Sequence, residues 1–171
     1  EDVMKKILFI ASEGVPFIKT GGLADVIGSL PKSVKKVLGD GGDVRVVVPL
    51  YPSIRDKFAE QLELVCETTV WLAWRNQYCG VWSLVKDGVK YYFIDNEYYF
   101  KRETFYGSYD DGERFAFFGS ENFLRSENVA GINSHGMSRI HKISHNKRTI
   151  ILICHYRSVS KYNQNNWCAI K

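Results

Sequence analysis

Apolar and polar residues follow two different periods near the start of the chain, and these periods predict its first elements. Residues 6–11 form a nearly continuous apolar run, which is typical of a buried strand in a parallel sheet. Farther along, apolar residues recur at separations of three and four, so they share one face of a predicted helix. These positions are Leu23, Val26, Ile27, Leu30, Val34, Val37 and Leu38. Gly39 is the predicted C-terminal cap, and Pro31 is expected to bend the axis or to start a second helical piece.

Further strands are predicted in the middle of the chain. Residues 43–48 read as a second core strand, and residues 62–74 and 78–85 read as two more. The pair Asp87-Gly88 is typical of a tight turn, and residues 89–94 would form the strand that follows it in a hairpin. The pattern therefore predicts an α/β fold in which an antiparallel hairpin is added to a parallel core.

Aromatic residues are dense between positions 91 and 100. They are Tyr91, Tyr92, Phe93, Tyr98, Tyr99 and Phe100. Exposed rings in such a cluster would offer a platform on which a sugar can stack. Core packing and strand pairing are the favoured interpretation, because aromatic residues are strongly preferred in strands.

The turn between the first strand and the helix combines a cation with backbone amides. A helix that begins at Gly22 or Leu23 directs its unpaired N–H groups and the positive end of its dipole into this turn, which favours an anion such as phosphate. Gly21 and Gly22 let a ligand approach the backbone without a Cβ in the way and permit a positive φ, and Lys19 adds a mobile charge. The alternative is a plain tight turn beside a solvated lysine.

Asp25 lies in the first turn of the predicted helix, where the dipole stabilises a carboxylate but the carboxylate would repel a bound phosphate. We therefore expect Asp25 to face another part of a ligand, such as sugar hydroxyls. Two common nucleotide-binding motifs do not occur here, namely Gly-x-x-x-x-Gly-Lys-Ser/Thr and a Gly-x-Gly-x-x-Gly that opens the helix. Neither an ordinary P-loop nor a dinucleotide fingerprint is predicted.

Three segments resemble one known family. The first runs from residue 6 to residue 31 and contains the string Lys-Thr-Gly-Gly-Leu-Ala-Asp-Val. The others are Val-Val-Val-Pro-Leu-Tyr at 46–51 and Asp-Asp-Gly-Glu-Arg-Phe-Ala-Phe-Phe at 110–118. In these motifs the chain closely resembles the start of bacterial glycogen synthases and plant starch synthases. The resemblance implies a partial Rossmann-like N-terminal domain of a GT-B glycosyltransferase.

The resemblance also implies an activity. Members of this family transfer glucose from ADP-glucose to the non-reducing end of an α-1,4-glucan such as glycogen or starch, with retention of configuration and without a cofactor or a required metal. The resemblance assigns contacts with the nucleotide-sugar diphosphate to Lys19, Gly21 and Gly22, and a place near the sugar to Asp25. Glu13 is a further candidate for contact with nucleotide or acceptor, although a loop glutamate is more often solvated. A sucrose synthase is the alternative enzyme.

The length of 171 residues suits one domain with a sizeable core and is too short for two. The family places a second Rossmann-like unit across a cleft, and the carboxylate and basic residues that stabilise the developing charge come largely from that unit. We therefore expect no catalytic residues in this chain and no activity from it alone. The alternative is a fragment that binds nucleotide sugar or glucan without turnover.

Charge divides the chain near residue 121. Residues 1–121 carry a net charge of −3, whereas residues 122–171 carry eight Lys or Arg and one acid, a net charge of +7. We therefore predict an incomplete synthase-like domain over 1–121 and a basic tail over 122–171 whose structure the sequence leaves open. A shifted reading frame or a truncated gene is our interpretation, since the resemblance and the amphipathic pattern both stop near Gly119. The apolar run 150–154 is a candidate to pair with an open edge of the sheet.

The tail also allows another class of function, in which basic side chains neutralise nucleic-acid phosphates and aromatic rings stack on bases. The residues in question are Arg125, Arg139, Lys142, Lys147, Arg148, Tyr156, Arg157, Tyr162 and Trp167. Because no recognised binding motif orders them, nucleic acid is not a predicted partner.

Metal and membrane signals are weak. His141 and His145 are four residues apart, with His135 and Cys154 as further possible ligands, but chance occurrence is the favoured explanation and no metal is predicted. The four cysteines form no C-x-x-C pair and suggest a reducing compartment. With no apolar run of signal-peptide or membrane-spanning length, we expect a protein of the bacterial cytoplasm.

Overall fold

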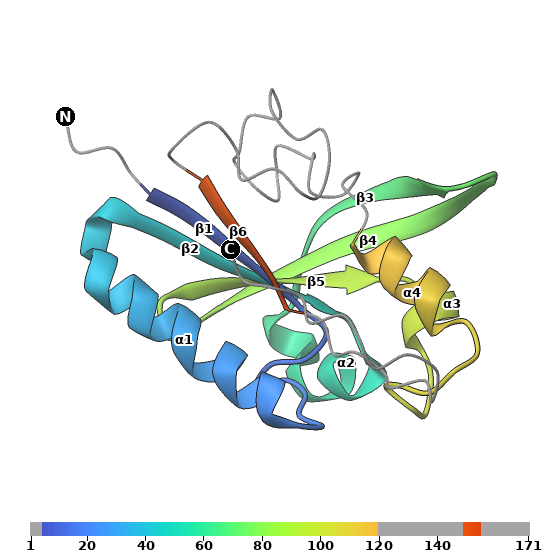
Figure 1. Ribbon diagram of the computed structural model, residues 1–171, viewed down its shortest axis with the longest axis horizontal. Helices are drawn as coiled ribbons and strands as arrows, with labels where there is room; N and C mark the ends of the chain where they lie inside the picture. Colours follow the sequence, from blue (N-terminus) through green and yellow to red (C-terminus); the bar gives the residue numbers. More distant parts are fainter. Residues whose placement is uncertain (1–4, 120–148, 155–171) are drawn as a thin grey trace, which may run out of the picture.

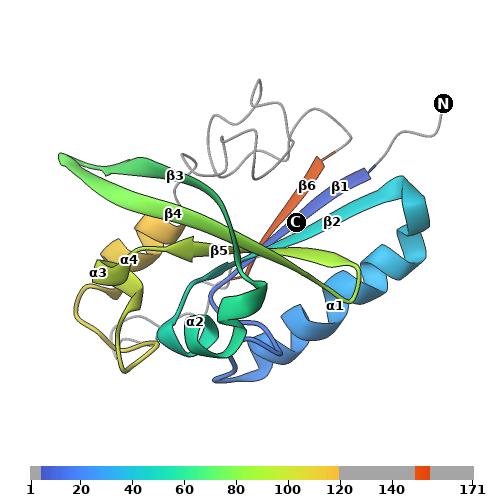
Figure 2. The same cartoon turned by 180° about the vertical axis from the view of Figure 1, so that it is seen from behind.

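The computed structural model describes residues 5–119 and 149–154, which form one six-stranded mixed sheet with helices packed against it (Figure 1). In chain order the elements are β1 (Lys5–Ala11), α1 (Gly22–Leu38), η1 (Gly39–Gly41), β2 (Gly42–Pro49), α2 (Pro52–Phe58), η2 (Ala59–Gln61), β3 (Glu63–Leu72), β4 (Arg75–Lys86), β5 (Val89–Asp95), α3 (Glu97–Phe100), α4 (Asp111–Phe118) and β6 (Thr149–Cys154). The strands are ordered β3-β4-β5-β2-β1-β6. Figures 1 and 2 place α1 along β1 and β2, and α3 and α4 at the opposite end of the molecule beside β3 and β4.

The sheet confirms the predicted α/β fold with a parallel core and an added antiparallel part. β1 runs parallel to β2, and β2 runs parallel to β5, whereas β4 is antiparallel to both β3 and β5. The turn between β4 and β5 is the predicted Asp87-Gly88 pair, with φ of 52° and 75°. Positive φ at both positions is what a type I′ hairpin turn requires. The carboxyl ends of β1, β2 and β5 therefore meet at one edge of the sheet.

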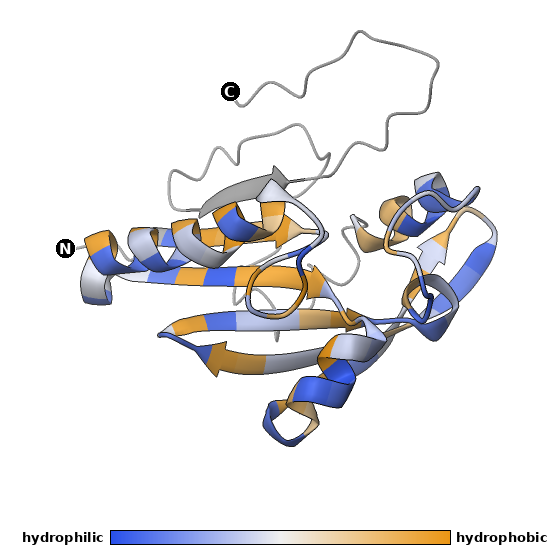
Figure 3. Ribbon diagram, turned by 90° about the horizontal axis from the view of Figure 1, so that it is seen from below, coloured by the Kyte–Doolittle hydropathy of each residue, from blue (hydrophilic) through white to orange (hydrophobic). Residues whose placement is uncertain are grey.

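Helix α1 is the predicted amphipathic helix, and it passes through Pro31 as one element without starting a second piece. Gly39 caps it at φ 56° and donates its N–H to the carbonyl of Lys35. The Lys35 ammonium donates in turn to the carbonyl oxygens of Gly39 and Gly42, which ties the C-terminus of the helix to the start of β2. In Figure 3 hydrophobic and hydrophilic positions are mixed along both the strands and the helices.

Aromatic side chains fill the core, as predicted. Five of the six aromatic residues between 91 and 100 are buried, and Tyr98 is the exception at 56% exposure. The ring of Phe17, from the loop after β1, packs edge-on against Tyr91 and Phe93 with centroids 4.8 and 5.0 Å apart. Five buried rings cannot stack on a sugar, so the core interpretation is confirmed for them. Their packing also fixes the loop that follows β1 against the sheet.

The described part of the tail is β6, which pairs in parallel with β1 so that Phe9 lies opposite Leu152. This confirms the prediction that residues 150–154 pair with the open edge of the sheet. The rest of the tail, including the histidines considered as metal ligands and the residues considered for nucleic acid, lies outside the described residues. The boundary between the two predicted regions at residue 121 also lies there and stays a prediction.

Candidate functional site

The loop between β1 and α1 folds back against the helix that it precedes. The N–H of Val15 donates to the carbonyl of Ala24 at 3.0 Å, and Gly14 and Ile18 form an isolated antiparallel bridge. A Cβ on Gly14 would lie 2.7 Å from the Cγ2 of Ile27 on α1, so only glycine fits this approach. These contacts hold the loop against the N-terminal part of α1.

Glu13 anchors this loop from inside. Its side chain is 1% exposed, and its Oε2 accepts hydrogen bonds from the N–H of Thr20 at 2.6 Å, the hydroxyl of Thr20 at 2.6 Å and the N–H of Gly21 at 3.3 Å. Its Oε1 is buried and has no partner among the described residues. The expectation that a loop glutamate is solvated is therefore wrong, because the turn after it supplies three donors and closes over it.

The donors left open for a ligand are those of the helix rather than those of the turn. Because Glu13 takes the amides of Thr20 and Gly21, the amides of α1 that stay open are the first ones from Gly22 onward, and no side chain of the described residues caps this end. A Cβ on Gly22 would meet nothing within 4 Å. Gly21 has φ −157°, an extended value that any residue adopts, and Gly22 does not have a positive φ, so the conformational freedom expected of these glycines is not used.

Lys19 and Asp25 flank the same end of α1. Lys19 Nζ lies 2.7 Å from Asp25 Oδ1, and the two side chains are 56% and 58% exposed. An exposed ion pair of this kind contributes little to stability, so an incoming phosphate can compete with Asp25 for the ammonium group. All five predicted site residues, Glu13, Lys19, Gly21, Gly22 and Asp25, are thus gathered around the N-terminus of one helix.

Two tyrosines that the sequence did not single out border this loop. The hydroxyl of Tyr106 lies 2.8 Å from the hydroxyl of Ser12, and the hydroxyl of Tyr51 donates to the carbonyl of Ser12 at 3.2 Å. Burial raises the pKa of both phenols, so both are neutral at pH 7 and able to donate. Tyr51 ends the motif at 46–51, which was the one signal for it, and Tyr106 had none.

Behind Tyr106 lies a buried ion pair on α4. Arg114 is fully buried, and its Nη2 donates to the carbonyl of Phe105 at 2.6 Å and to Asp111 Oδ1 at 2.8 Å. The other carboxylate oxygen of Asp111 accepts from the N–H of Gly107 at 2.7 Å. The Nε and Nη1 atoms of Arg114 have no partner in the described part of the chain. The resemblance motif at 110–118 thus meets the loop after β1 through the residues around Tyr106.

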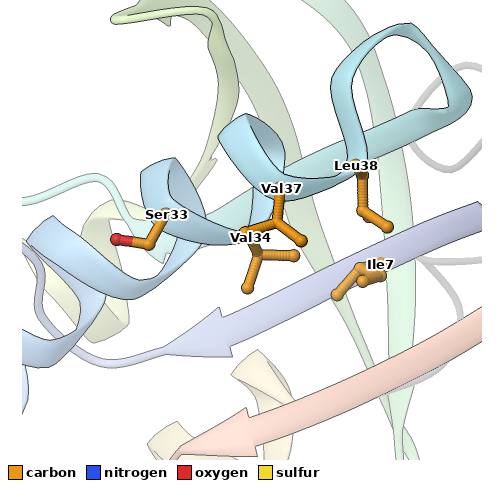
Figure 4. A pocket seen from close by; sticks show the side chains of 5 residues that line it. All are labelled: Ile7, Ser33, Val34, Val37 and Leu38. Atoms are coloured by element: carbon orange, nitrogen blue, oxygen red, sulfur yellow. The ribbon is translucent and has the colours of Figure 1, made fainter.

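Other features of the described ranges do not compete with this site. An apolar groove of about 230 Å³ lies between β1 and the C-terminal half of α1, lined by Ile7, Ser33, Val34, Val37 and Leu38 (Figure 4). It has no charged lining residue and sits at the other end of the helix from Gly22. Within residues 5–119 and 149–154 no cluster of His, Cys, Asp or Glu is arranged to hold a metal ion. Over the same residues no helix is long and apolar enough to cross a membrane.

Comparison with known proteins gives consistent matches. The family model of the starch synthase catalytic domain matches residues 6–126. Over 113 residues the chain is 54% identical to a glycogen synthase of Anoxybacillus flavithermus and 58% identical to one of Desulforamulus reducens, which covers 66% of this chain and 23% of each relative. The solved catalytic domain of starch synthase IV from Arabidopsis thaliana, bound to ADP and acarbose, aligns with a TM-score of 0.56 and 26% identity over 68% of this chain and 24% of that one. The chain thus spans about a quarter of the length of these relatives.

Proposed function

This chain belongs to the starch synthase catalytic domain family, and on that premise we propose that it carries the donor-binding part of a retaining glucosyltransferase. The proposed reaction transfers glucose from ADP-glucose to the non-reducing end of an α-1,4-glucan. The observation that carries the proposal is the uncapped N-terminus of α1, with Lys19 beside it and open space in front of Gly22. These groups suit the diphosphate of a nucleotide sugar.

The same groups suit the chemistry of the reaction. When the bond between glucose and the diphosphate breaks, negative charge grows on the leaving phosphate oxygens. Fixed helix amides and an ammonium group stabilise that charge more strongly in the transition state than in the ground state, which is how binding energy accelerates a reaction. In this proposal Lys19 leaves Asp25 for the diphosphate, and Asp25 becomes free to accept hydrogen bonds from the glucose hydroxyls.

Glu13 has a double role in the proposal. Its Oε2 already holds the turn, so the proposed contact with nucleotide or acceptor falls to Oε1, which is unpartnered among the described residues; because Oε1 is buried, this contact requires the turn to move when the ligand binds. A carboxylate oxygen in that position accepts a hydrogen bond, so the matching ligand group is a hydroxyl or an amino group. The ADP and acarbose bound to the starch synthase IV domain support ligands of this chemical kind.

We further propose that this chain binds the donor without turning it over. The part that matches spans 23% of the relative from Anoxybacillus flavithermus, and in this proposal the groups that face the donor from the other side of the site lie in the remainder of such proteins. The proposed setting is the bacterial cytoplasm, where Cys66 and Cys79, both free thiols, stay reduced.

Titration of the chain with ADP-glucose, followed by calorimetry or ligand-observed NMR, tests the binding proposal. Lys19→Ala is expected to weaken binding about tenfold, as loss of one charge-assisted hydrogen bond would. Lys36→Ala is the matched control, because Lys36 is exposed in the last turn of the same helix. Equal affinity of wild type and Lys19→Ala would refute the assignment. Glucosyl transfer to glycogen by the isolated chain would refute the proposed lack of turnover.

A further inference from the structure

The buried ion pair between Asp111 and Arg114 has no place in the donor contacts described so far, yet it is costly to bury. Arg114 is fully buried, and Asp111 is 8% exposed. Removing two charges from water is compensated only when hydrogen bonds satisfy them and the geometry is good. Their hydrogen bonds go to the backbone of Phe105 and Gly107, the two neighbours of Tyr106.

We propose that Asp111 and Arg114 are positioning residues that hold Tyr106 against the loop of Ser12 and Thr20, and so shape the donor site. The inference rests on the proposed function, since that function makes the loop a binding site. Tyr106 itself is the group that touches the loop. Asp111 and Arg114 act through it.

The geometry leaves Tyr106 little freedom. The carbonyl before it is held by Arg114 Nη2 at 2.6 Å, and the N–H after it is held by Asp111 Oδ2 at 2.7 Å. Gly107 has φ +93°, a value that only glycine adopts without strain, so this backbone conformation has no steric cost. The residue is thus fixed on both sides by one ion pair.

The ring of Tyr106 is held by packing, just as the backbone on either side of it is held by hydrogen bonds. The Tyr106 ring stacks on Phe115 of α4 at 5.9 Å and 27°, and the Arg114 guanidinium lies 4.8 Å from the centre of the same Phe115 ring. With backbone and ring both held from α4, the hydroxyl is delivered to Ser12 Oγ at 2.8 Å. Burial raises the pKa of this phenol, and hydrogen bonding with Ser12 and with Thr20, whose hydroxyl also donates to Glu13, partly offsets the rise. In this proposal the ion pair on α4 therefore sets the position of Tyr106 at the edge of the donor site.

The test compares Asp111→Asn and Arg114→Lys with Tyr106→Phe, with the matched control Arg75→Lys. Arg75, at the start of β4, pairs with Glu113 of α4, which also accepts a hydrogen bond from the hydroxyl of Tyr99. In protein labelled with 3-fluorotyrosine, the Tyr106 signal is identified by its loss in Tyr106→Phe. Asp111→Asn and Arg114→Lys are expected to shift that signal in the ligand-free protein, and Arg75→Lys is expected to leave it in place.

ADP-glucose binding supplies the second readout. Asp111→Asn and Tyr106→Phe are each expected to lower the affinity several-fold, and Asp111→Asn is expected to add nothing once Tyr106 is Phe, because both act through one hydroxyl. A purely structural role of Asp111 would lower the affinity in both backgrounds. Circular dichroism and thermal melting show whether each variant folds, and if Arg114→Lys does not, the near-isosteric Asp111→Asn decides alone.

The two proposals fail in different ways. A Tyr106 signal that does not move in folded Asp111→Asn overturns the positioning role, whatever the binding result. If wild type does not bind ADP-glucose while the Tyr106 signal does shift in Asp111→Asn, the proposed function falls and the positioning of Tyr106 stands. Additive losses of affinity for Asp111→Asn and Tyr106→Phe overturn the inference as well.

Discussion

Glu13 and Thr20 are joined twice, because one carboxylate oxygen accepts both the backbone N–H and the hydroxyl of Thr20, each at 2.6 Å. They are seven positions apart in the chain, so this contact closes the loop that carries Lys19. The second carboxylate oxygen of Glu13, Oε1, is buried and has no partner among the described residues. The two oxygens can therefore be tested separately.

Glu13→Ala is expected to lower the free energy of unfolding by about 1–3 kcal/mol, since it removes the acceptor of three hydrogen bonds that close the loop. Glu13→Gln keeps one acceptor oxygen for Thr20 but replaces Oε1 with an amino group. We expect Glu13→Gln to unfold near the wild-type temperature while binding ADP-glucose more weakly. Thermal unfolding and titration of both variants check this, and a wild-type melting temperature for Glu13→Ala would contradict the anchoring role.

Two glycines of α1 should respond in opposite ways to the same substitution. A Cβ on Gly28 would lie 2.8 Å from the Cβ of Val15 and 3.0 Å from its carbonyl, whereas a Cβ on Gly22 meets nothing within 4 Å. Gly28→Ala is expected to destabilise the fold by about 1–3 kcal/mol through overpacking. Gly22→Ala should leave stability unchanged or slightly higher, because alanine favours helix, and should weaken ADP-glucose binding. Chemical denaturation and titration separate the two, and a Gly22→Ala protein that binds normally would exclude Gly22 from the site.

Asp25 offers a comparison between two ligands. Its ion pair with Lys19 is exposed, so Asp25→Asn should change stability by less than about 1 kcal/mol. Loss of its charge also removes a competitor for Lys19 and a source of repulsion toward phosphate. We therefore expect Asp25→Asn to bind ADP as well as or better than wild type, and ADP-glucose worse, because the sugar loses its acceptor. Parallel loss of both affinities would argue that Asp25 acts on the turn and not on the sugar.

Cys79 provides a prediction about pH. Burial raises the pKa of its thiol to about 12, with smaller contributions from Cys66 and Asp95. Because the thiolate is the reactive form, folded Cys79 is expected to resist iodoacetamide at about pH 8.5, where an ordinary thiol is half ionised. Because folding raises this pKa, the folded protein holds the thiol proton more tightly than the unfolded chain does. The contribution of Cys79 to the free energy of unfolding is therefore fully present below about pH 9 and declines as the pH rises further. Peptide mapping by mass spectrometry measures the labelling, the half-buried Cys66 is the internal reference, and early labelling of Cys79 would contradict its burial.

The order of elements was readable from the chain because each signal is local. Each of these signals involves residues that are close together in the sequence: the apolar run before Ser12, the three-and-four spacing of α1 and the Asp87-Gly88 turn. The effect of Pro31 was predicted only in part: α1 continues through it as one helix, with Pro31 buried, and no second helical piece starts there. The grouping of the candidate site residues was predictable to the same extent: Lys19, Gly22 and Asp25 lie within seven consecutive residues, so a sequence motif contains them.

The sequence by itself determined the α/β pattern, the amphipathic helix and the grouping of Lys19, Gly22 and Asp25 at its N-terminus. The tertiary structure alone decided that Glu13 is buried and occupies two of the amides, that β6 lies beside β1, and that Tyr106 reaches Ser12 across 94 residues. The physical reason is distance along the chain: helix periodicity and turn chemistry act over a few residues, whereas burial, strand neighbours and side-chain partners depend on which distant segments the packed core brings together.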